Sequence, residues 1–482
     1  MSTAVAIHQG EARAYSDEWH DGDAFAELAQ LRALSALFDG KGDNLFRGIV
    51  EPGQSVVIKP NWVLDQHPYE FDLFSIVTHS AVLRAIVDLV FECLQGDGTI
   101  TIADAPQWNC NFDNLLRQTQ VEAIREHYRR RHSFDVDILD LRQVGTTAYG
   151  FVGRADRVQL PGDPLGYVAV DLGAESAFIG LENIDRIYGA DYDRAETRSH
   201  HNASTHEYLI SKTILGADTF IHVPKLKVHK KVGVTLNAKG MVGINGNKNW
   251  IAHYRVGPPS AGGDEFPDGG TTAERARKQT MRLVLDHLLA PQSRPREIAF
   301  GVLRRGYHVV KPLLGKYAFP DEPETFPEGG NWWGNDTAWR MTADLARIAR
   351  YAGADGTIRE TPQRRFVSVV DGIVAGELEG PLQPTPKPCG VLMAGESLLG
   401  VDIAATRLMG LDWRKVRSLQ WLVEESPHEM LAGDPAEEIE IRSNIEPWER
   451  LLVDPEVEDL AFRPHPQWVG HVELDRRAPS AA

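Results

Sequence analysis

The residues best suited to chemistry lie between positions 219 and 263, a stretch that contains no aspartate or glutamate. It holds seven basic residues, although the whole chain has a formal net charge of −17. Interleaved glycines let backbone N–H groups approach an anion closely, and lysines supply compact positive charge. The basic residues are Lys225, Lys227, Lys230, Lys231, Lys239, Lys248 and Arg255. The stretch predicts a binding site for an anion, either phosphate, carboxylate or nucleotide, although a solvated loop that offsets acidic neighbours would have the same composition.

Histidines gather in and around the same region. His200, His201 and His206 precede the basic stretch, and His229 lies inside it. Imidazole nitrogens with a carboxylate suit a divalent transition metal, so His200, His201, His206 and Asp104 form a candidate metal site. Alternatively, His201, His206 and His229 are candidate general acids or bases, which need only a pKa near neutrality and reach to the substrate. Surface histidines in a polar loop would show the same spacing.

Further polar residues stand where β-strands are expected to end. Lys59 and Asn61 close one such strand, Asp104 a second and Asp371 a third. In a parallel sheet these ends share one edge, where open α/β sheets bind their ligands. We therefore expect Asp371 to assist catalysis, although an aspartate at a strand end also often caps the following turn. The residues expected to bind the substrate are Lys59, Asn61, Lys225, Lys227 and Lys239.

A second unusual cluster, NWWGND, occupies residues 331–336. Trp333 is the candidate for stacking on a sugar or planar ring of the substrate, while neighbouring polar groups fix that ring. The alternative is that the tryptophans anchor a lid to the core. Both interpretations hold if the lid closes over the ligand.

The elements that would position these residues alternate between strands and helices. Short β-branched runs predict strands at residues 55–59, 99–103, 219–223, 366–370 and 391–394. Apolar residues at helical spacing, or a capping box at Ser204 and Glu207, predict helices at residues 80–94, 204–215 and 404–409. This alternation predicts an α/β fold with a mainly parallel sheet flanked by helices.

At 482 residues the chain is too long for one ordinary core, so we expect an inserted lid or second lobe. Two loops rich in proline, glycine and acidic residues mark the insertion, on either side of a helix expected near residues 273–290. The expected order is an N-terminal arm and helix (1–48), an α/β core lobe (49–255), the insertion (256–345), the second part of the core (346–455) and a tail (456–482).

Bulk properties exclude several classes of protein. The acidic balance disfavours nucleic-acid binding, because phosphate neutralisation needs a basic face. No stretch reaches the roughly 18 apolar residues of a membrane helix, and the N-terminus lacks a signal-peptide pattern. Cys93, Cys110 and Cys389 are scattered, so we expect a reducing, cytoplasmic location and no iron–sulfur cluster. No membrane or nucleic-acid partner is expected.

Four blocks of the sequence resemble a known family. VVIKPNWV at 56–63, FIHVPKLKVHKKVGVTLNAKGMVGI at 220–244 and SVVDGIVAGELEGP at 368–381 are similar to the signature blocks of the domain-of-unknown-function-362 family, and residues 392–410 resemble its closing block. Some members carry ferredoxin-like cysteine motifs, from which this chain departs. The blocks also resemble, more distantly, lactate-racemase-like proteins, which place histidines and lysines around a nickel-pincer nucleotide. The resemblance implies no particular reaction.

Two functions fit these residues. The first is an enzyme for a small anionic metabolite that works by histidine acid–base chemistry or by metal-assisted, oxidative chemistry. The second is a non-catalytic binding protein for an anionic cofactor or nucleotide. No serine elbow or catalytic cysteine setting is recognisable, which disfavours covalent acyl transfer.

Overall fold

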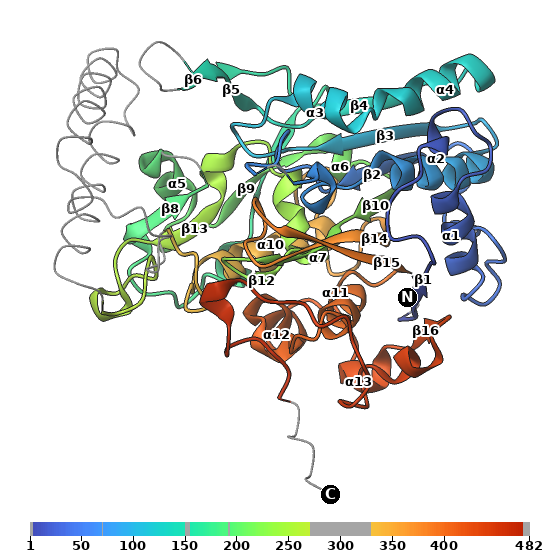
Figure 1. Cartoon of the computed structure of the whole chain (residues 1–482). Coiled ribbons are helices and arrows are strands. Elements are labelled where there is room, and N and C mark those ends of the chain that lie inside the picture. The colour runs from blue at the N-terminus through green and yellow to red at the C-terminus, as the bar shows by residue number, and fades with distance from the viewer. Residues whose placement is uncertain (1–2, 70, 150–154, 191–192, 270–328, 476–482) are drawn as a thin grey trace, which may run out of the picture.

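The computed structural model describes residues 3–69, 71–149, 155–190, 193–269 and 329–475. Ten strands within these residues form one mixed sheet (Figure 1). They are β1 (Val5–Gln9), β2 (Ser55–Pro60), β3 (Thr99–Asp104), β4 (Val136–Asp140), β10 (Thr219–Val223), β11 (Lys225–His229), β12 (Gly233–Val234), β14 (Arg365–Glu377), β15 (Thr385–Gly395) and β16 (Ile441–Ser443). Their order is β16–β1–β15–β14–β10–β2–β3–β4, and β11 pairs with both β14 and β12.

Most neighbours in this sheet run parallel. Strands β4, β3, β2, β10 and β14 are parallel in turn, whereas β15 is antiparallel to both β14 and β1. The carboxyl ends of β2, β3 and β10 therefore lie at one edge. The predicted α/β fold with a mainly parallel sheet is confirmed.

Helices cover both faces of the sheet. The side chains of α1 (Ala26–Ser35), α2 (Ser80–Leu94), α3 (Phe112–Thr119) and α4 (Glu122–His132) join one hydrophobic cluster. Those of α7 (Leu236–Gly240), α10 (Ala338–Tyr351), α11 (Leu398–Leu408) and α12 (Arg417–Glu424) join the other. Three short helical segments complete the described set: α5 (Arg194–His200), α6 (Lys212–Leu215) and α13 (Pro435–Glu438).

Successive side chains along the strands of the sheet belong to different hydrophobic clusters. Val57 and Phe220 belong to the cluster of α7 and α10, whereas Ile58 and Ile221 belong to that of α2. Successive residues of a strand point to opposite faces, so each buried strand contributes side chains to both hydrophobic clusters. Each fully buried aliphatic side chain of this kind contributes about 1.5–3 kcal/mol.

Three two-stranded ribbons lie outside the main sheet. They pair β5 (Val144–Tyr149) with β6 (Ala155–Gln159), β7 (Tyr167–Asp171) with β9 (Glu207–Ser211), and β8 (Ile187–Gly189) with β13 (Ala252–Arg255). All three pairings are antiparallel.

Several predicted elements keep their bounds and one changes type. The helix at 80–94 and the strand at 219–223 are confirmed at both ends. The helix predicted over 204–215 is wrong, because that segment forms β9 followed by the single turn α6. Tyr208 and Ile210 of β9 are buried and pair with Val170 and Val168 of β7. This long-range pairing outweighs the local capping-box pattern.

The segments outside the expected core are partly described. Residues 5–9 of the expected N-terminal arm form β1, inside the sheet between β15 and β16. In the expected tail, the side chains of Val457, Phe462, Trp468 and Val472 are buried. The helix expected near 273–290 lies outside the described residues. Among the described helices, none has the length and apolar character needed to cross a membrane.

Candidate functional site

A buried ion pair stands at the carboxyl edge of the sheet. Lys59 is the next-to-last residue of β2 and Asp104 ends the neighbouring parallel strand β3, which brings Lys59 Nζ to 2.9 Å from Asp104 Oδ1. Both side chains are almost fully buried. The second carboxylate oxygen accepts a 2.7 Å hydrogen bond from the backbone N–H of Trp62. Asp104 is thus held by its partners and faces a region rich in lysine.

A cavity of about 290 Å³ opens beside this ion pair. Six lysines line it, and Asp104 is the one acidic side chain among its described lining residues. The lysines are Lys59, Lys227, Lys230, Lys231, Lys239 and Lys248. His229, His253, Asn61, Trp62, Trp108 and Asn331 also line it. We call this space the lysine cavity.

Strand β11 explains how several of these residues reach the cavity. Pro224 separates β10 from β11, so the segment expected to be a basic loop instead adds a strand beside β14. Lys227 and His229 are two residues apart and therefore share one face of β11, while Leu226 and Val228 enter the hydrophobic core. The tail fixes this segment, because Trp468 Nε1 donates a 2.7 Å hydrogen bond to the carbonyl of Lys230.

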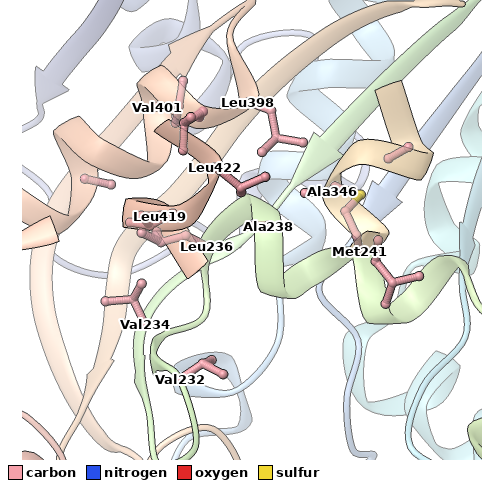
Figure 2. Packing of buried hydrophobic residues seen from close by; sticks show 14 of the residues in the cluster. Val232, Val234, Leu236, Ala238, Met241, Ala346, Leu398, Val401, Leu419 and Leu422 are labelled. Atoms are coloured by element: carbon pink, nitrogen blue, oxygen red, sulfur yellow. The ribbon is translucent and has the colours of Figure 1, made fainter. Parts of the chain in front are cut away.

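Helix α7 carries Lys239 and is held from outside its own sequence. The carboxylate of Asp402, buried in α11, accepts hydrogen bonds from the backbone N–H groups of Asn237 (2.7 Å) and Ala238 (2.8 Å). It therefore satisfies the free N–H groups at the start of α7. Figure 2 shows Leu236 and Ala238 of α7 near Leu398 and Leu422 of the surrounding helices.

Four of the six lysines are anchored by protein oxygen atoms. Lys59 Nζ bonds to Asp104, and Lys231 Nζ donates to the carbonyl of Gly329. Lys227 Nζ donates to the carbonyls of Ile76 (2.6 Å) and Pro381 (3.3 Å). Lys248 Nζ donates to the carbonyls of Ala105 (2.8 Å), Val242 (3.2 Å) and Asn245 (3.2 Å). Protein oxygen atoms therefore hold these four side chains in defined positions.

Lys230 and Lys239 differ from the other four. Both side chains are half-buried and line the cavity. Within the described part of the chain, neither ammonium group has a hydrogen-bond partner. Their charged ends are therefore available to a ligand.

Burial shifts the pKa values of these lysines downward. Loss of solvent, followed by the charge of Lys59, lowers the pKa of Lys239 to about 8. Loss of solvent lowers the pKa of Lys248 to about 7, although the charge of Asp104 opposes the change. The pKa values of Lys227 and Lys231 are lowered well below the usual value, chiefly by burial and then by a neighbouring lysine. An anion in the cavity would reverse these shifts.

Two histidines face the same cavity. The Nδ1 atom of His229 accepts a 3.0 Å hydrogen bond from the backbone N–H of Lys231, so its Nε2 atom carries the proton of the neutral ring. Burial and then the nearby lysines, Lys239 among them, hold the pKa values of His229 and His253 well below the usual value. Both rings are therefore neutral imidazoles at neutral pH.

The glycines at this edge serve packing. A Cβ atom on Gly243 would lie 1.9 Å from Asp104 Oδ1 and 2.6 Å from Lys59 Nζ. A Cβ atom on Gly240 would lie 2.2 Å from the ring of His222. These two glycines let the chain that follows α7 approach the strand ends closely.

Lys225 and Asp371 lie apart from the cavity. Lys225 Nζ is 2.9 Å from Asp371 Oδ2, and neither side chain lines the cavity. Asp371 also accepts hydrogen bonds from Tyr15 Oη (2.8 Å) and from the backbone N–H of His79 (3.0 Å). Asp371 was expected at a strand end, but β14 continues to Glu377, so Asp371 sits inside the strand. This buried network ties the N-terminal segment to the sheet.

The predicted metal ligands are not brought together. Asp104 lines the lysine cavity, whereas His200, His201 and His206 do not. His201 Nε2 donates to the carbonyl of Trp250 at 2.8 Å, and His200 Nδ1 lies 2.8 Å from Glu207 Oε2. Within the described ranges, no three potential ligands of the His, Cys, Asp or Glu types group together.

Burial also shifts the pKa values of two of these histidines. It lowers the pKa of His201 to about 3 and that of His206 to about 4. His201 and His206 pack near the ring of Phe178. Their surroundings explain this placement, since the segment that carries them belongs to the β7–β9 ribbon and not to the carboxyl edge of the main sheet.

The tryptophan cluster, residues 331–336, contributes to the cavity lining a different residue from the one expected. Trp333 stacks on His471 with ring centroids 4.1 Å apart and is 39% exposed, away from the cavity lining. Asn331 lines the cavity instead. Trp332 is buried, and its Nε1 atom donates a 2.9 Å hydrogen bond to the carbonyl of Asp264.

Several cavity residues were not singled out as site residues from the sequence. The absence of acidic residues in the stretch already marked Lys230, Lys231 and Lys248 as part of the expected anion site. Trp62 and Trp108 carried no signal, because each lies just beyond a strand end in a loop of ordinary composition. The seventh basic residue, Arg255, pairs with Asp264 instead.

The geometry defines an α/β protein with a lysine-rich cavity at the carboxyl edge of its main sheet. Residues 155–407 match the family model described as domain of unknown function (DUF362). The chain therefore belongs to the DUF362 family. The matched segment contains five of the six cavity lysines, whereas Lys59 and Asp104 precede it. No curated protein and no solved structure matched the chain.

Proposed function

We propose that the chain is an enzyme that binds a small anionic metabolite in the lysine cavity and moves a proton with His229 or His253. The supporting observation is that six lysines surround a cavity of about 290 Å³ whose one described acidic lining residue is already paired. Like charges held this close destabilise one another, and a bound anion relieves that repulsion. The volume suits a small metabolite.

The histidines favour an enzyme over a passive binding site. A neutral imidazole is the proton-accepting form, and His229 and His253 stand beside the ammonium groups that would hold the anion. General acid–base catalysis needs such a group within reach of the substrate. Since no group of metal ligands is present in the described residues, proton transfer, as in an isomerase or lyase, fits these side chains better than metal-assisted chemistry.

The alternative is a non-catalytic binding protein for an anionic cofactor or nucleotide. It is supported by the four lysines that protein oxygen atoms already hold in fixed positions, because a rigid cationic site binds without any chemistry. All three cysteines are free, which supports the further proposal of a reducing, cytoplasmic location.

The test begins with a panel of phosphorylated and carboxylated metabolites, screened by the shift that each causes in the unfolding temperature. Proton NMR then follows turnover of each stabilising compound. We expect His229→Gln or His253→Gln to lower the turnover rate at least about 100-fold while the stabilising shift persists. Stabilising compounds that the unaltered protein never converts would support the binding protein and contradict the enzyme.

A further inference from the structure

The six cavity lysines are not equivalent, and one of them differs from the rest in a chemically useful way. Lys59, Lys227, Lys231 and Lys248 each bond to a carbonyl or carboxylate oxygen. Although burial lowers the pKa values of these lysines too, their Nζ atoms are held in place by protein oxygen atoms. These four side chains are therefore placed to hold an anion, but they would have to break these hydrogen bonds before their nitrogen atoms could attack a carbonyl carbon.

The two remaining lysines have different neighbours. Burial lowers the pKa of Lys230 and the charge of Glu379 opposes that shift, whereas the positive charge of Lys59 adds to the effect of burial at Lys239. Burial and an adjacent cation both favour the neutral amine at Lys239, whose pKa is lowered to about 8. Lys239 Nζ also has no hydrogen-bond partner among the described residues. It is the cavity amine that is both unrestrained and partly deprotonated near neutral pH.

The groups around Lys239 complete the requirements of imine chemistry. Lys239 acts electrostatically on both His229 and His253, so two neutral imidazoles stand near its side chain. The anchored lysines offer fixed positive charge for an acidic group of the substrate. An unrestrained amine, a proton carrier and an anion anchor therefore share one cavity.

We propose that Lys239 is a catalytic nucleophile that forms an imine with a carbonyl compound bearing a carboxylate or phosphate group. This inference rests on the proposed function and names its substrate class. The Nζ atom of the neutral amine attacks the carbonyl carbon and forms a C–N bond. The carbonyl oxygen leaves as water and takes both amine protons, one of them relayed by His229 or His253. No oxidant or reductant takes part.

The test uses pyridoxal 5′-phosphate, an aldehyde that carries a phosphate, as the probe. The full-length protein is mixed with one equivalent of the probe at pH 7.5, reduced with sodium borohydride, digested and mapped by mass spectrometry. We expect Lys239 to carry at least about tenfold more label than Lys230, because a larger fraction of its amine is neutral. Excess pyrophosphate should remove that label.

Two variants sharpen the result. Lys239→Arg keeps the charge and should lose the cavity label, while Lys212→Arg, which changes an exposed lysine of α6, should keep it. Label that spreads evenly over the lysines, or that favours Lys230, would overturn the proposal. This outcome is measured in the unaltered protein, so it does not depend on the stability of the variants.

Calorimetry with pyrophosphate on the same preparation distinguishes a failure of the proposed imine from a failure of the proposed anion site. Pyrophosphate binding without preferential label at Lys239 overturns the imine and leaves the proposed anion site intact. Absence of pyrophosphate binding together with unprotected labelling overturns both.

Discussion

Each cavity lysine carries a charge that its surroundings disfavour. Lys239 and Lys248 have pKa values lowered to about 8 and about 7, in both cases first by burial. A lysine whose pKa is lower in the folded protein binds fewer protons there than in the unfolded chain. The free energy of unfolding therefore rises through these groups as the pH is raised from their folded pKa values, about 7 and about 8, toward the ordinary lysine value of 10.5. Binding of an anion has the opposite dependence.

The first prediction concerns that dependence. The affinity for sulfate, which does not itself titrate in this range, should fall as the pH is raised through about 7 and about 8, because Lys248 and Lys239 lose their protons. Titration calorimetry in buffers of different ionisation enthalpy measures both the affinity and the proton uptake. Sulfate binding that is independent of pH, with no proton uptake, would contradict the assignment of these lysines to the site.

A second prediction separates the lysine cavity from the buried pair formed by Lys225 and Asp371. Changing Asp371→Asn leaves the Lys225 ammonium without its counter-ion in a fully buried position. Loss of one partner of such a pair costs about 3–5 kcal/mol, so the free energy of unfolding in urea should fall by that order. The double change Lys225→Met with Asp371→Leu should cost less, because no charge is left unpaired.

The same variants test the placement of these residues. At a temperature where Asp371→Asn remains folded, its affinity for pyrophosphate should equal that of the unaltered protein, because Asp371 does not line the cavity. A loss of pyrophosphate affinity without a loss of stability would contradict the placement of Asp371 outside the binding site.

Among the elements, α7 and the chain that follows it determine whether the cavity forms. The start of α7 depends on the carboxylate of Asp402 in α11, and its end depends on two glycines that meet His222 and the Lys59–Asp104 pair. Burial raises the pKa of Asp402 to about 7, because three hydrogen bonds from α7 only partly compensate its loss of solvent. The position of Lys239 is thus set by residues far away in the sequence.

The third prediction concerns Gly243. In Gly243→Ala the new methyl carbon would lie closer to Asp104 Oδ1 and to Lys59 Nζ than non-bonded atoms can approach. The free energy of unfolding should fall by about 1–3 kcal/mol, and pyrophosphate affinity should fall with it as the ion pair shifts. The matched control is Gly216→Ala, whose methyl group would lie 3.1 Å from one carbonyl oxygen and far from the cavity. Equal effects of both changes would contradict the close approach at Gly243.

Some helices and strands could be predicted from the sequence and others could not. The buried helix α2 is recognisable because apolar residues and a clear N-terminus coincide over residues 80–94. The segment 204–215 misleads, because Ser204 and Glu207 satisfy a local helix pattern while Tyr208 and Ile210 pair with a strand about 40 residues earlier. Asp371 misleads for a similar reason. Its strand was expected to end there, but pairing with β15 carries β14 on to Glu377.

Over the whole molecule, the lysine cavity joins segments that are distant in the chain. Residues near positions 60, 105, 230–253, 331 and 381 meet at the carboxyl edge of the main sheet. From the sequence we expected Lys59, Asn61, Lys227, Lys239 and His229 to belong to the site, and all five line the cavity. Their roles in binding and catalysis stay predictions.

The remaining cavity residues required the three-dimensional structure. Trp62 and Trp108 enter the cavity from loops, and His253 enters it from β13, which lies outside the main sheet. The histidines at 200, 201 and 206 were expected near the basic stretch, but His200 and His201 lie at the end of α5 and His206 directly precedes β9, away from the cavity lining. Proximity in sequence was a poor guide for residues outside the main sheet.

The central claim is that the lysine cavity binds a small anion. Titration calorimetry with pyrophosphate, applied to the unaltered protein, to Lys230→Met and to the exposed control Lys212→Met, tests it directly. We predict one binding site in the unaltered protein, at least about tenfold weaker binding in Lys230→Met through the loss of a charge-assisted hydrogen bond, and no change in the control. Absence of pyrophosphate binding, or equal weakening in both variants, would contradict the claim.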